Sequence, residues 1–182
     1  MSRLPDPQQH DDLLNFQLKN LVAIGGAPAI RLCEGRFGVS RCQWRLVAAL
    51  TEDGPMSPSQ LAARTRWELA RISKLLTEIL GKGLVERVTE AADQRRATVR
   101  VTAAGRKLYA ELFPLLAAIN RRLMAVLDDD EARVLESCLR KLTERACAID
   151  AEGGGVDVRA DRWRGGTRRA GQAGQVGQLT PT

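Results

Sequence analysis

The sequence predicts a mainly α-helical protein with one small β-hairpin. Three features lead to this fold class: long stretches with apolar residues at helical spacing, two short stretches that alternate apolar and polar residues, and an aromatic content of only 4%. With so few aromatic residues, the core should consist mostly of Leu, Val, Ala and Ile on helices. The segment 57–102 reads as helix, turn, helix, strand, basic loop and strand, which is typical of a winged helix-turn-helix.

The composition suits one domain with a tail and mildly favours an acidic partner. The 182 residues include 28 Lys and Arg against 22 Asp and Glu, for a net charge of +6. The first twelve residues are polar, unlike a signal peptide, and the longest apolar stretch, 21–30, is too short to span a bilayer. The four cysteines are scattered without a CxxC motif, so we expect a reducing cytoplasm and neither a metal site nor a disulfide scaffold.

Two helices are expected before the winged segment. Residues 1–10 should be a flexible N-terminus. Apolar residues from 11 to 35 predict a long first helix, weakened or kinked at Gly25-Gly26 and at Pro28. Ser40 is placed to cap a second helix, 41–52, which Gly54-Pro55 ends. Its predicted core face is formed by Trp44, Val47, Ala48 and Leu50.

The helix-turn-helix has clear start and stop signals. Ser57 and Gln60 form a capping box with Pro58 at the first helical position, and this helix should stop near Thr65. The next helix is predicted over 67–82, with Gly83 ending it. Its apolar residues cluster on one side; they are Leu69, Ile72, Leu75, Leu76, Ile79 and Leu80.

The hairpin and the last two helices complete the predicted domain, 11–150. Strands over 84–88 and 98–102 flank a polar loop, and Thr102 then caps a helix over 103–127 that Pro114 should bend. A capping box at Asp128 starts a last helix to about 150. Its predicted inward residues are Val134, Leu135, Leu139 and Leu142.

The composition changes after residue 151. The segment 151–182 is rich in Gly and Arg and has almost nothing to bury, so we predict a disordered basic tail. A solvated tail without function and a non-specific role on DNA both remain open.

The second helix of the helix-turn-helix is the candidate reader of a DNA major groove. Arg71 is expected to fork onto a guanine, and Lys74 to meet a phosphate. Glu68 either accepts a hydrogen bond from a cytosine or pairs with Arg71. The full set of candidate contacts in this lobe, 57–102, outside the hairpin loop is Ser57, Ser59, Trp67, Glu68, Ala70, Arg71, Ser73 and Lys74.

The hairpin loop supplies a second candidate contact. Arg95 and Arg96 lie at its tip, where a guanidinium group is suited to enter a narrow minor groove. Asp93, two residues before Arg95, is expected to hold that side chain in place. The alternative is a solvated basic hairpin that binds no DNA.

From about residue 13 to 145, the chain resembles the MarR family of bacterial winged-helix regulators. The resemblance rests on FGVSRCQWRLVAAL, on GPMSPSQLAARTRWELARISKLLTEILGKGLVER and on DQRRATVRVTAAGRKL. It implies a homodimer joined by the helices in 11–35 and 103–150, a pseudo-palindromic operator in double-stranded DNA, and repression relieved by a small ligand, with no cofactor. Two departures stand out: Arg66-Trp67 replaces a frequent Gly and aliphatic residue, and Leu69-Ala70 replaces common polar residues.

The resemblance also places a ligand between the dimerisation helices and the DNA-binding lobe. The stretch RLCEGRFGVSRCQWR is similar to that of regulators of aromatic-compound catabolism, which favours a small aromatic or phenolic acid. Arg31 is the expected cationic anchor and Trp44 the aromatic wall. The candidate ligand-binding residues are His10, Asn15, Lys19, Arg31, Arg36 and Trp44. Roles without a ligand remain open for three of them: a solvated His10, an ion pair at an interface for Arg31, and a place in the core for Trp44.

Three other functions are alternatives to a ligand-responsive repressor. An enzyme is disfavoured because the sequence has no nucleophile elbow, phosphate loop, metal-ligand spacing or His–carboxylate arrangement, so no catalytic residue is proposed. A winged helix used only for protein association is the second. The third is a redox-sensing regulator that uses Cys33 or Cys42, although both thiols fall in stretches expected to be buried and inert.

Overall fold

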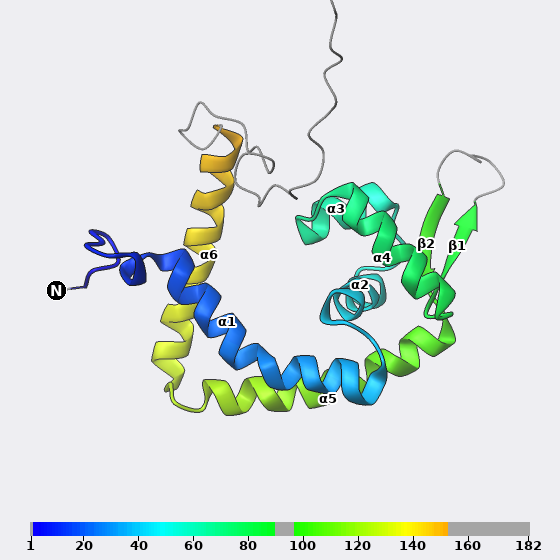
Figure 1. Cartoon of the computed structure of the whole chain (residues 1–182), viewed down its shortest axis with the longest axis horizontal. Helices are drawn as coiled ribbons and strands as arrows, with labels where there is room; N and C mark the ends of the chain where they lie inside the picture. The colour runs from blue at the N-terminus through cyan, green and yellow to red at the C-terminus, as the bar shows by residue number, and fades with distance from the viewer. Residues whose placement is uncertain (1, 90–96, 153–182) are drawn as a thin grey trace, which may run out of the picture. The chain divides into compact units, whose positions relative to one another are not determined.

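The computed structural model describes residues 2–89 and 97–152 (Figure 1). The chain divides into two compact units, 1–127 and 128–182. The first unit contains a short 3₁₀ turn, five helices, a π-helical turn and two strands, and the described part of the second is one helix. The elements are α1 (Leu14–Arg31), the π-helical turn (Leu32–Arg36), α2 (Arg41–Glu52), α3 (Pro58–Thr65), α4 (Leu69–Gly81), β1 (Val85–Thr89), β2 (Ala97–Val101), α5 (Ala103–Met124) and α6 (Asp129–Ala151).

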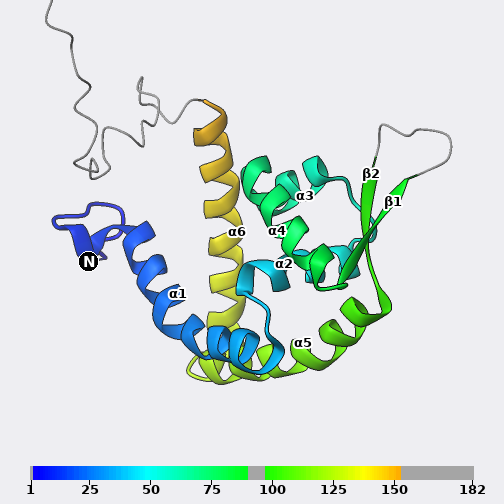
Figure 2. The same cartoon turned by 45° about the vertical axis from the view of Figure 1, so that its right-hand side comes forward.

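Helix α1 is unbroken through both glycines and Pro28, and only its end departs from α-helical geometry, in the π-helical turn. It is preceded by a 3₁₀ turn, His10–Asp12, which the buried Asp12 carboxylate closes by accepting hydrogen bonds from the amides of Gln8 and Gln9 at 3.1 and 3.2 Å. Figures 1 and 2 show α1 beside the C-terminal part of α5, and α3 and α4 grouped with the hairpin.

Helix α2 is the centre of the first unit, because it packs against α3, α4, α5 and β2. The predicted capping box forms, with the Ser40 hydroxyl accepting from the Gln43 amide. Val47 and Leu50 are buried as predicted, and Trp44 and Ala48 are half-buried. The buried surface is wider than the predicted face, since Leu46 is also fully buried. A helix with neighbours on several sides has no single core stripe.

A buried amide ties the start of α2 to the end of α4. Gln43 is only 6% exposed, and its Nε2 donates to the Glu78 carboxylate at 2.7 Å. The Lys82 ammonium group donates to Gln43 Oε1 at 2.9 Å and also to the Gly38 carbonyl oxygen. These hydrogen bonds replace the bonds to water that the Gln43 amide loses on burial, so its burial carries little free-energy cost.

The first helix of the helix-turn-helix begins as predicted, but the turn between α3 and α4 is longer than predicted. Ser57 caps α3 with Pro58 at the first position, but Trp67 and Glu68 precede α4 rather than belong to it. The prediction that Leu69 joins the apolar face of α4 is wrong, because Leu69 occupies the first helical position and is 50% exposed. Ile72, Leu75, Leu76 and Ile79 form the buried face. Arg66 adopts a left-handed conformation, φ 57°, where a glycine would be unstrained.

The predicted hairpin is present and gains a third backbone partner. β1 and β2 pair antiparallel with Val85 opposite Val101 and Thr89 opposite Ala97. Met56, just before α3, forms a bridge with Val99: each amide donates to the other residue's carbonyl, at 3.0 and 2.8 Å. The base of the hairpin is therefore fixed to the entrance of α3. The loop residues Asp93, Arg95 and Arg96 lie outside the described residues.

The corner between β2 and α5 explains the glycine at position 105. Thr102 caps α5 by accepting from the Gly105 amide at 3.1 Å, and its hydroxyl donates to the Gly83 carbonyl at 2.7 Å. This draws the first turn of α5 onto the start of β1. A Cβ on Gly105 would lie only 2.2 Å from the Leu84 carbonyl oxygen and 2.6 Å from a Val101 methyl group.

Helix α6 starts at the predicted capping box, where the Asp128 carboxylate accepts from the Glu131 amide at 2.8 Å. The prediction that its apolar residues face inward is wrong for the single chain. Val134, Leu135, Leu139 and Leu142 are 62, 38, 41 and 44% exposed. Helical periodicity identifies the apolar face of a helix but not what covers it. Within residues 2–89 and 97–152, no helix is long and apolar enough to cross a membrane.

Gly105→Ala should destabilise the protein by about 3 kcal/mol, because the new methyl group meets backbone that cannot move without disturbing the hairpin. Thermal or urea unfolding of the purified variant measures this loss. Gly81→Ala is the matched control: it lies in α4 with nothing within 4 Å of the added Cβ, and should gain about 0.5–1 kcal/mol. Equal stabilities for the two variants would contradict the close approach at Gly105.

Candidate nucleic-acid interface and ligand pocket

The first turns of α4 present a polar exposed face. Ala70, Arg71, Ser73 and Lys74 are all exposed, while the opposite face of the helix is in the core. The Ser73 hydroxyl donates to the Leu69 carbonyl at 3.0 Å, which leaves its oxygen able to accept. An exposed helix face with an arginine and a lysine near its N-terminus suits insertion into a major groove.

Arg71 does not extend freely into solvent. Its guanidinium carbon lies over the Trp67 ring, 4.2 Å from the centroid, and its Nη2 donates to the Cys42 sulfur at 2.9 Å. The guanidinium carbon of Arg45 lies over the same ring at 5.0 Å. Trp67, a candidate DNA contact within the helix predicted over 67–82, precedes α4, is half-buried and packs against the core.

The remaining predicted contacts are distributed around this face. Ser59 is exposed, whereas the Ser57 hydroxyl is used to cap α3. Glu68 is exposed at the N-cap position of α4. Arg64, which the sequence did not single out, pairs with Asp53 at 2.7 Å, and this hydrogen bond, followed by the charge of Asp53, raises the pKa of Arg64.

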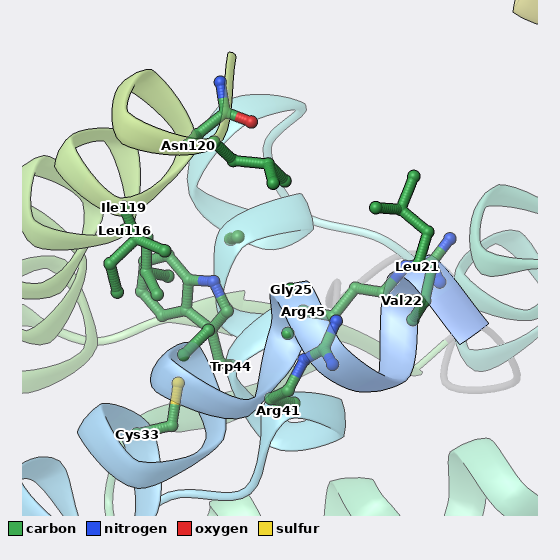
Figure 3. Close-up of a pocket in the computed structure, with 14 residues that line it drawn as sticks. Leu21, Val22, Gly25, Cys33, Arg41, Trp44, Arg45, Leu116, Ile119 and Asn120 are labelled. Carbon is green, nitrogen blue, oxygen red and sulfur yellow. The ribbon is translucent and has the colours of Figure 1, made fainter. Parts of the chain in front are cut away.

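A pocket of about 500 Å³ opens between α1, α2 and α5 within the first unit. In the view of Figure 3, Arg41 and Arg45 extend toward α1, and Trp44 extends toward Leu116 and Ile119 of α5. Most of the lining is apolar, with two guanidinium groups and one amide as polar exceptions. The lining residues are Leu21, Val22, Gly25, Gly26, Ala29, Cys33, Arg41, Trp44, Arg45, Ala48, Leu116, Ile119, Asn120 and Leu123.

Trp44 alone among the predicted ligand-binding residues lines this pocket. Arg31, the expected anchor, is exposed, as are Asn15 and Lys19. His10 instead packs on Phe16, with ring centroids 4.3 Å apart, and Arg36 lies over Phe37. The pocket takes its cationic groups from Arg41 and Arg45. Their spacing around Trp44, three residues before it and one after, places all three on one side of α2 and was the signal available in the sequence.

Two glycines make room at the α1 side of the pocket. A Cβ on Gly26 would lie 2.5 Å from an Arg41 nitrogen, so the guanidinium group rests directly against the α1 backbone. A Cβ on Gly25 would be 3.4 Å from the Leu123 side chain of α5. The glycine pair that predicted a weak point in a helix therefore allows α2 and α5 to approach α1 closely.

An aromatic stack fixes Trp44 in the pocket wall. Trp44 stacks on Tyr109 with centroids 5.4 Å apart, and Tyr109 stacks on Phe113 at 5.3 Å. The Tyr109 hydroxyl donates to the Glu52 carboxylate at 2.8 Å. This hydrogen bond, and next burial, raise the pKa of Tyr109, so the phenol stays protonated and keeps its donor. A ring held by two further aromatics is a rigid surface for a planar ligand.

The two cysteines proposed as redox sensors differ in environment. Cys33 is fully buried at the pocket wall, and burial raises the pKa of its thiol despite the nearby positive charge of Arg41. A buried, protonated thiol is a poor nucleophile. Cys42 is half-buried, and its sulfur accepts the hydrogen bond from Arg71.

Known proteins share both the sequence pattern and the fold. A model of the MarR family matches residues 37–96. The transcriptional regulator FarR of Neisseria gonorrhoeae is 28% identical over 109 residues, which are 60% of this chain and 75% of that protein. A solved structure from Pseudomonas aeruginosa, described as a probable transcriptional regulator, is 28% identical with a TM-score of 0.63, over 74% of this chain and 99% of that one. The MepR–DNA complex of S. aureus is 20% identical with a TM-score of 0.67, over 73 and 98% of the two chains, and supports the fold.

The thiol of Cys33 should react far more slowly in the native protein than in the unfolded one. In a variant with the other three cysteines changed to Ser, labelling by a charged disulfide reagent at neutral pH should be slowed on the order of 100-fold or more relative to the same variant in urea. The cause is burial together with the raised pKa, which lowers the thiolate fraction. Comparable native and unfolded rates would show that Cys33 is accessible and would revive its role as a sensor.

Proposed function

We propose that the chain is a winged-helix transcriptional regulator of the MarR family and that it represses transcription as a homodimer bound to a pseudo-palindromic operator. Its relatives and its fold are those of regulators, which are not enzymes. A dimer on promoter DNA represses by occupying the sequence that the polymerase needs. A small aromatic acid in the pocket is the proposed signal for release.

The observation that carries this proposal is the first part of α4. Arg71 and Lys74 are exposed there, on a helix whose other face is locked into the core by four buried aliphatic residues. The helix is therefore rigid and its charged face is free of protein neighbours large enough to bury it. A solved relative of the same fold is in complex with DNA. Arg71 is the proposed base reader and Lys74 the proposed phosphate contact. Arg95 and Arg96 of the loop remain candidates from the sequence.

The dimer is supported by uncovered apolar surface on the long helices. A single chain leaves large aliphatic side chains in water at several positions of α1, of α6 and of the turn between α5 and α6, more than scattered surface residues require. These include Leu21, Val22, Ile24, Val126, Val134, Leu135, Leu139 and Leu142, exposed by 38 to 83%. A second copy of the chain is the proposed cover, and two copies present two α4 helices to the two half-sites.

The pocket supports a planar anionic ligand. Trp44 provides a flat apolar wall, and Arg41 and Arg45 provide positive charge on the side of α1. A carboxylate on an aromatic ring would accept charge-assisted hydrogen bonds from guanidinium groups while the ring lies against the apolar lining. The proposed anchor is thus Arg41, in place of the Arg31 expected from the sequence.

Operator affinity should fall steeply with salt. For a duplex obtained by binding-site selection, a dimer with ~6–10 phosphate contacts should lose on the order of 10³–10⁵ in affinity between about 50 and 200 mM salt. Fluorescence anisotropy at several salt concentrations measures the slope, and the stoichiometry at saturation should be two chains per duplex. A salt-independent affinity, or one chain per duplex, would contradict the proposal.

Arg71→Ala should change the sequence preference of DNA binding, whereas Lys74→Ala should change the overall affinity. The first should relax the preference at one base position by about 10-fold, because a guanidinium fork reads one base. The second should weaken selected and random duplexes alike and reduce the salt slope by about two units, one for each protomer of the dimer. Competition with single-base variants of the selected duplex separates the two. An equal loss on random DNA for Arg71→Ala would refute the base contact.

Benzoate, the simplest aromatic acid, should raise the melting temperature of the protein, since a ligand that binds only the folded state stabilises it by mass action. Arg41→Gln should weaken benzoate binding by about 10-fold or more through loss of a charged hydrogen-bond donor. Arg31→Gln is the matched control and should leave the affinity unchanged, because Arg31 does not line the pocket. Thermal shift and calorimetric titration measure both. If benzoate binds no variant, or Arg31→Gln alone loses it, the proposed pocket chemistry is wrong.

A further inference from the structure

Trp67 occupies a special position in the first unit. It lies in the short connection between α3 and α4, half-buried against the core. Two arginines from two different helices lie over its indole ring: Arg45 of α2 at 5.0 Å and Arg71 of α4 at 4.2 Å from the centroid. Tryptophan offers the strongest ring for a guanidinium group, so both contacts are attractive.

Beyond the Trp67 ring, the two arginines lie at different surfaces of the protein. Arg45 also lines the pocket between α1, α2 and α5. Arg71 belongs to the exposed face of α4, and its Nη2 donates to the Cys42 sulfur at 2.9 Å. The same indole ring therefore contacts one arginine that faces a ligand pocket and one that faces the proposed DNA groove.

The two guanidinium groups repel each other. Both are permanently charged and lie 4.2 and 5.0 Å from one centroid, so their separation is about one Debye length or less and part of their repulsion remains at physiological ionic strength. Each arginine therefore holds the ring less firmly when the other is present. We expect removal of one to strengthen the contact of the other.

We propose that Arg45 and Trp67 are positioning residues for base reading: Arg45 competes with Arg71 for the Trp67 ring and thereby keeps Arg71 ready to leave it for DNA. An anion in the pocket that pairs with Arg45 ends this competition. Arg71 then stays on Trp67 and Cys42, and discrimination between operator and random DNA falls. By reciprocity, bound operator disfavours the anion. The inference rests on the proposed function, because Arg71 must contact a base.

Charge removal at Arg45 tests the coupling without any ligand. The readout is the ratio of affinities for the selected duplex and for random duplex of equal length, at one salt concentration. Arg45→Gln should lower this ratio by about 5-fold or more, within the usual range for coupled sites. Arg64→Gln is the matched control: it also removes one exposed arginine near α4, but Arg64 pairs with Asp53. Its ratio should stay that of the wild type, since a lost non-specific charge weakens both duplexes equally.

Substitutions of Trp67 test whether the effect of Arg45 acts through the indole ring. In a Trp67→Leu background, Arg45→Gln should leave the ratio unchanged, and in a Trp67→Phe background its effect should be intermediate, because phenylalanine is a weaker cation partner. Unfolding curves confirm that each background is folded, and Trp67→Phe serves if Trp67→Leu does not fold. An undiminished effect of Arg45→Gln without the indole overturns the inference, as does the absence of any effect in the wild-type background. A wild type that binds no selected duplex refutes the proposed function instead, and this inference with it.

Discussion

The structure depends on the burial of α2 on several sides at once. Leu46, Val47 and Leu50 are almost completely removed from water, so this one helix is the common neighbour of α3, α4, α5 and β2. The Gln43 side-chain amide adds a directional constraint to this apolar packing, since its nitrogen donates to Glu78 and its oxygen accepts from Lys82, both at the end of α4. A helix held in this way has no freedom to rotate. Its remaining side, which carries Arg41, Trp44 and Arg45, is consequently presented to α1 and α5 in a fixed orientation.

Features that depend on neighbouring residues in the sequence were predictable. The caps at Ser40, Ser57, Thr102 and Asp128 all form, because a cap is a hydrogen bond within one helical turn. The prediction for Leu69 is wrong because periodicity identifies an apolar stripe but not the residue at which the helix begins. That residue depends on the turn before α4. Arg66 in the left-handed region ends α3 without a glycine, at a strain on the order of 1 kcal/mol. The sequence pointed to this turn, because Arg66 stands where the resemblance led us to expect a glycine.

The candidate site was predictable in its chemistry more than in its residues. An aromatic wall and a cation were expected, and Trp44 is in the pocket, but the cations are Arg41 and Arg45. The difference arises because the pocket is made where α1 and α5 approach α2, and that approach depends on the absence of side chains at Gly25 and Gly26. Local spacing shows that Arg41, Trp44 and Arg45 share one side of α2, but it does not show that α1 and α5 close over that side. The same holds for the shared ring of Trp67, which joins residues 45 and 71 only in three dimensions.

The bridge between Met56 and Val99 has a consequence for how sequences of this kind can vary. It is made by main-chain groups alone, two hydrogen bonds that every amino acid except proline can form. The attachment of the hairpin to the entrance of α3 is therefore insensitive to which side chains the hairpin carries. Substitutions of side chains in β1 and β2 can therefore accumulate without loss of the two hydrogen bonds that hold the hairpin to the segment before α3.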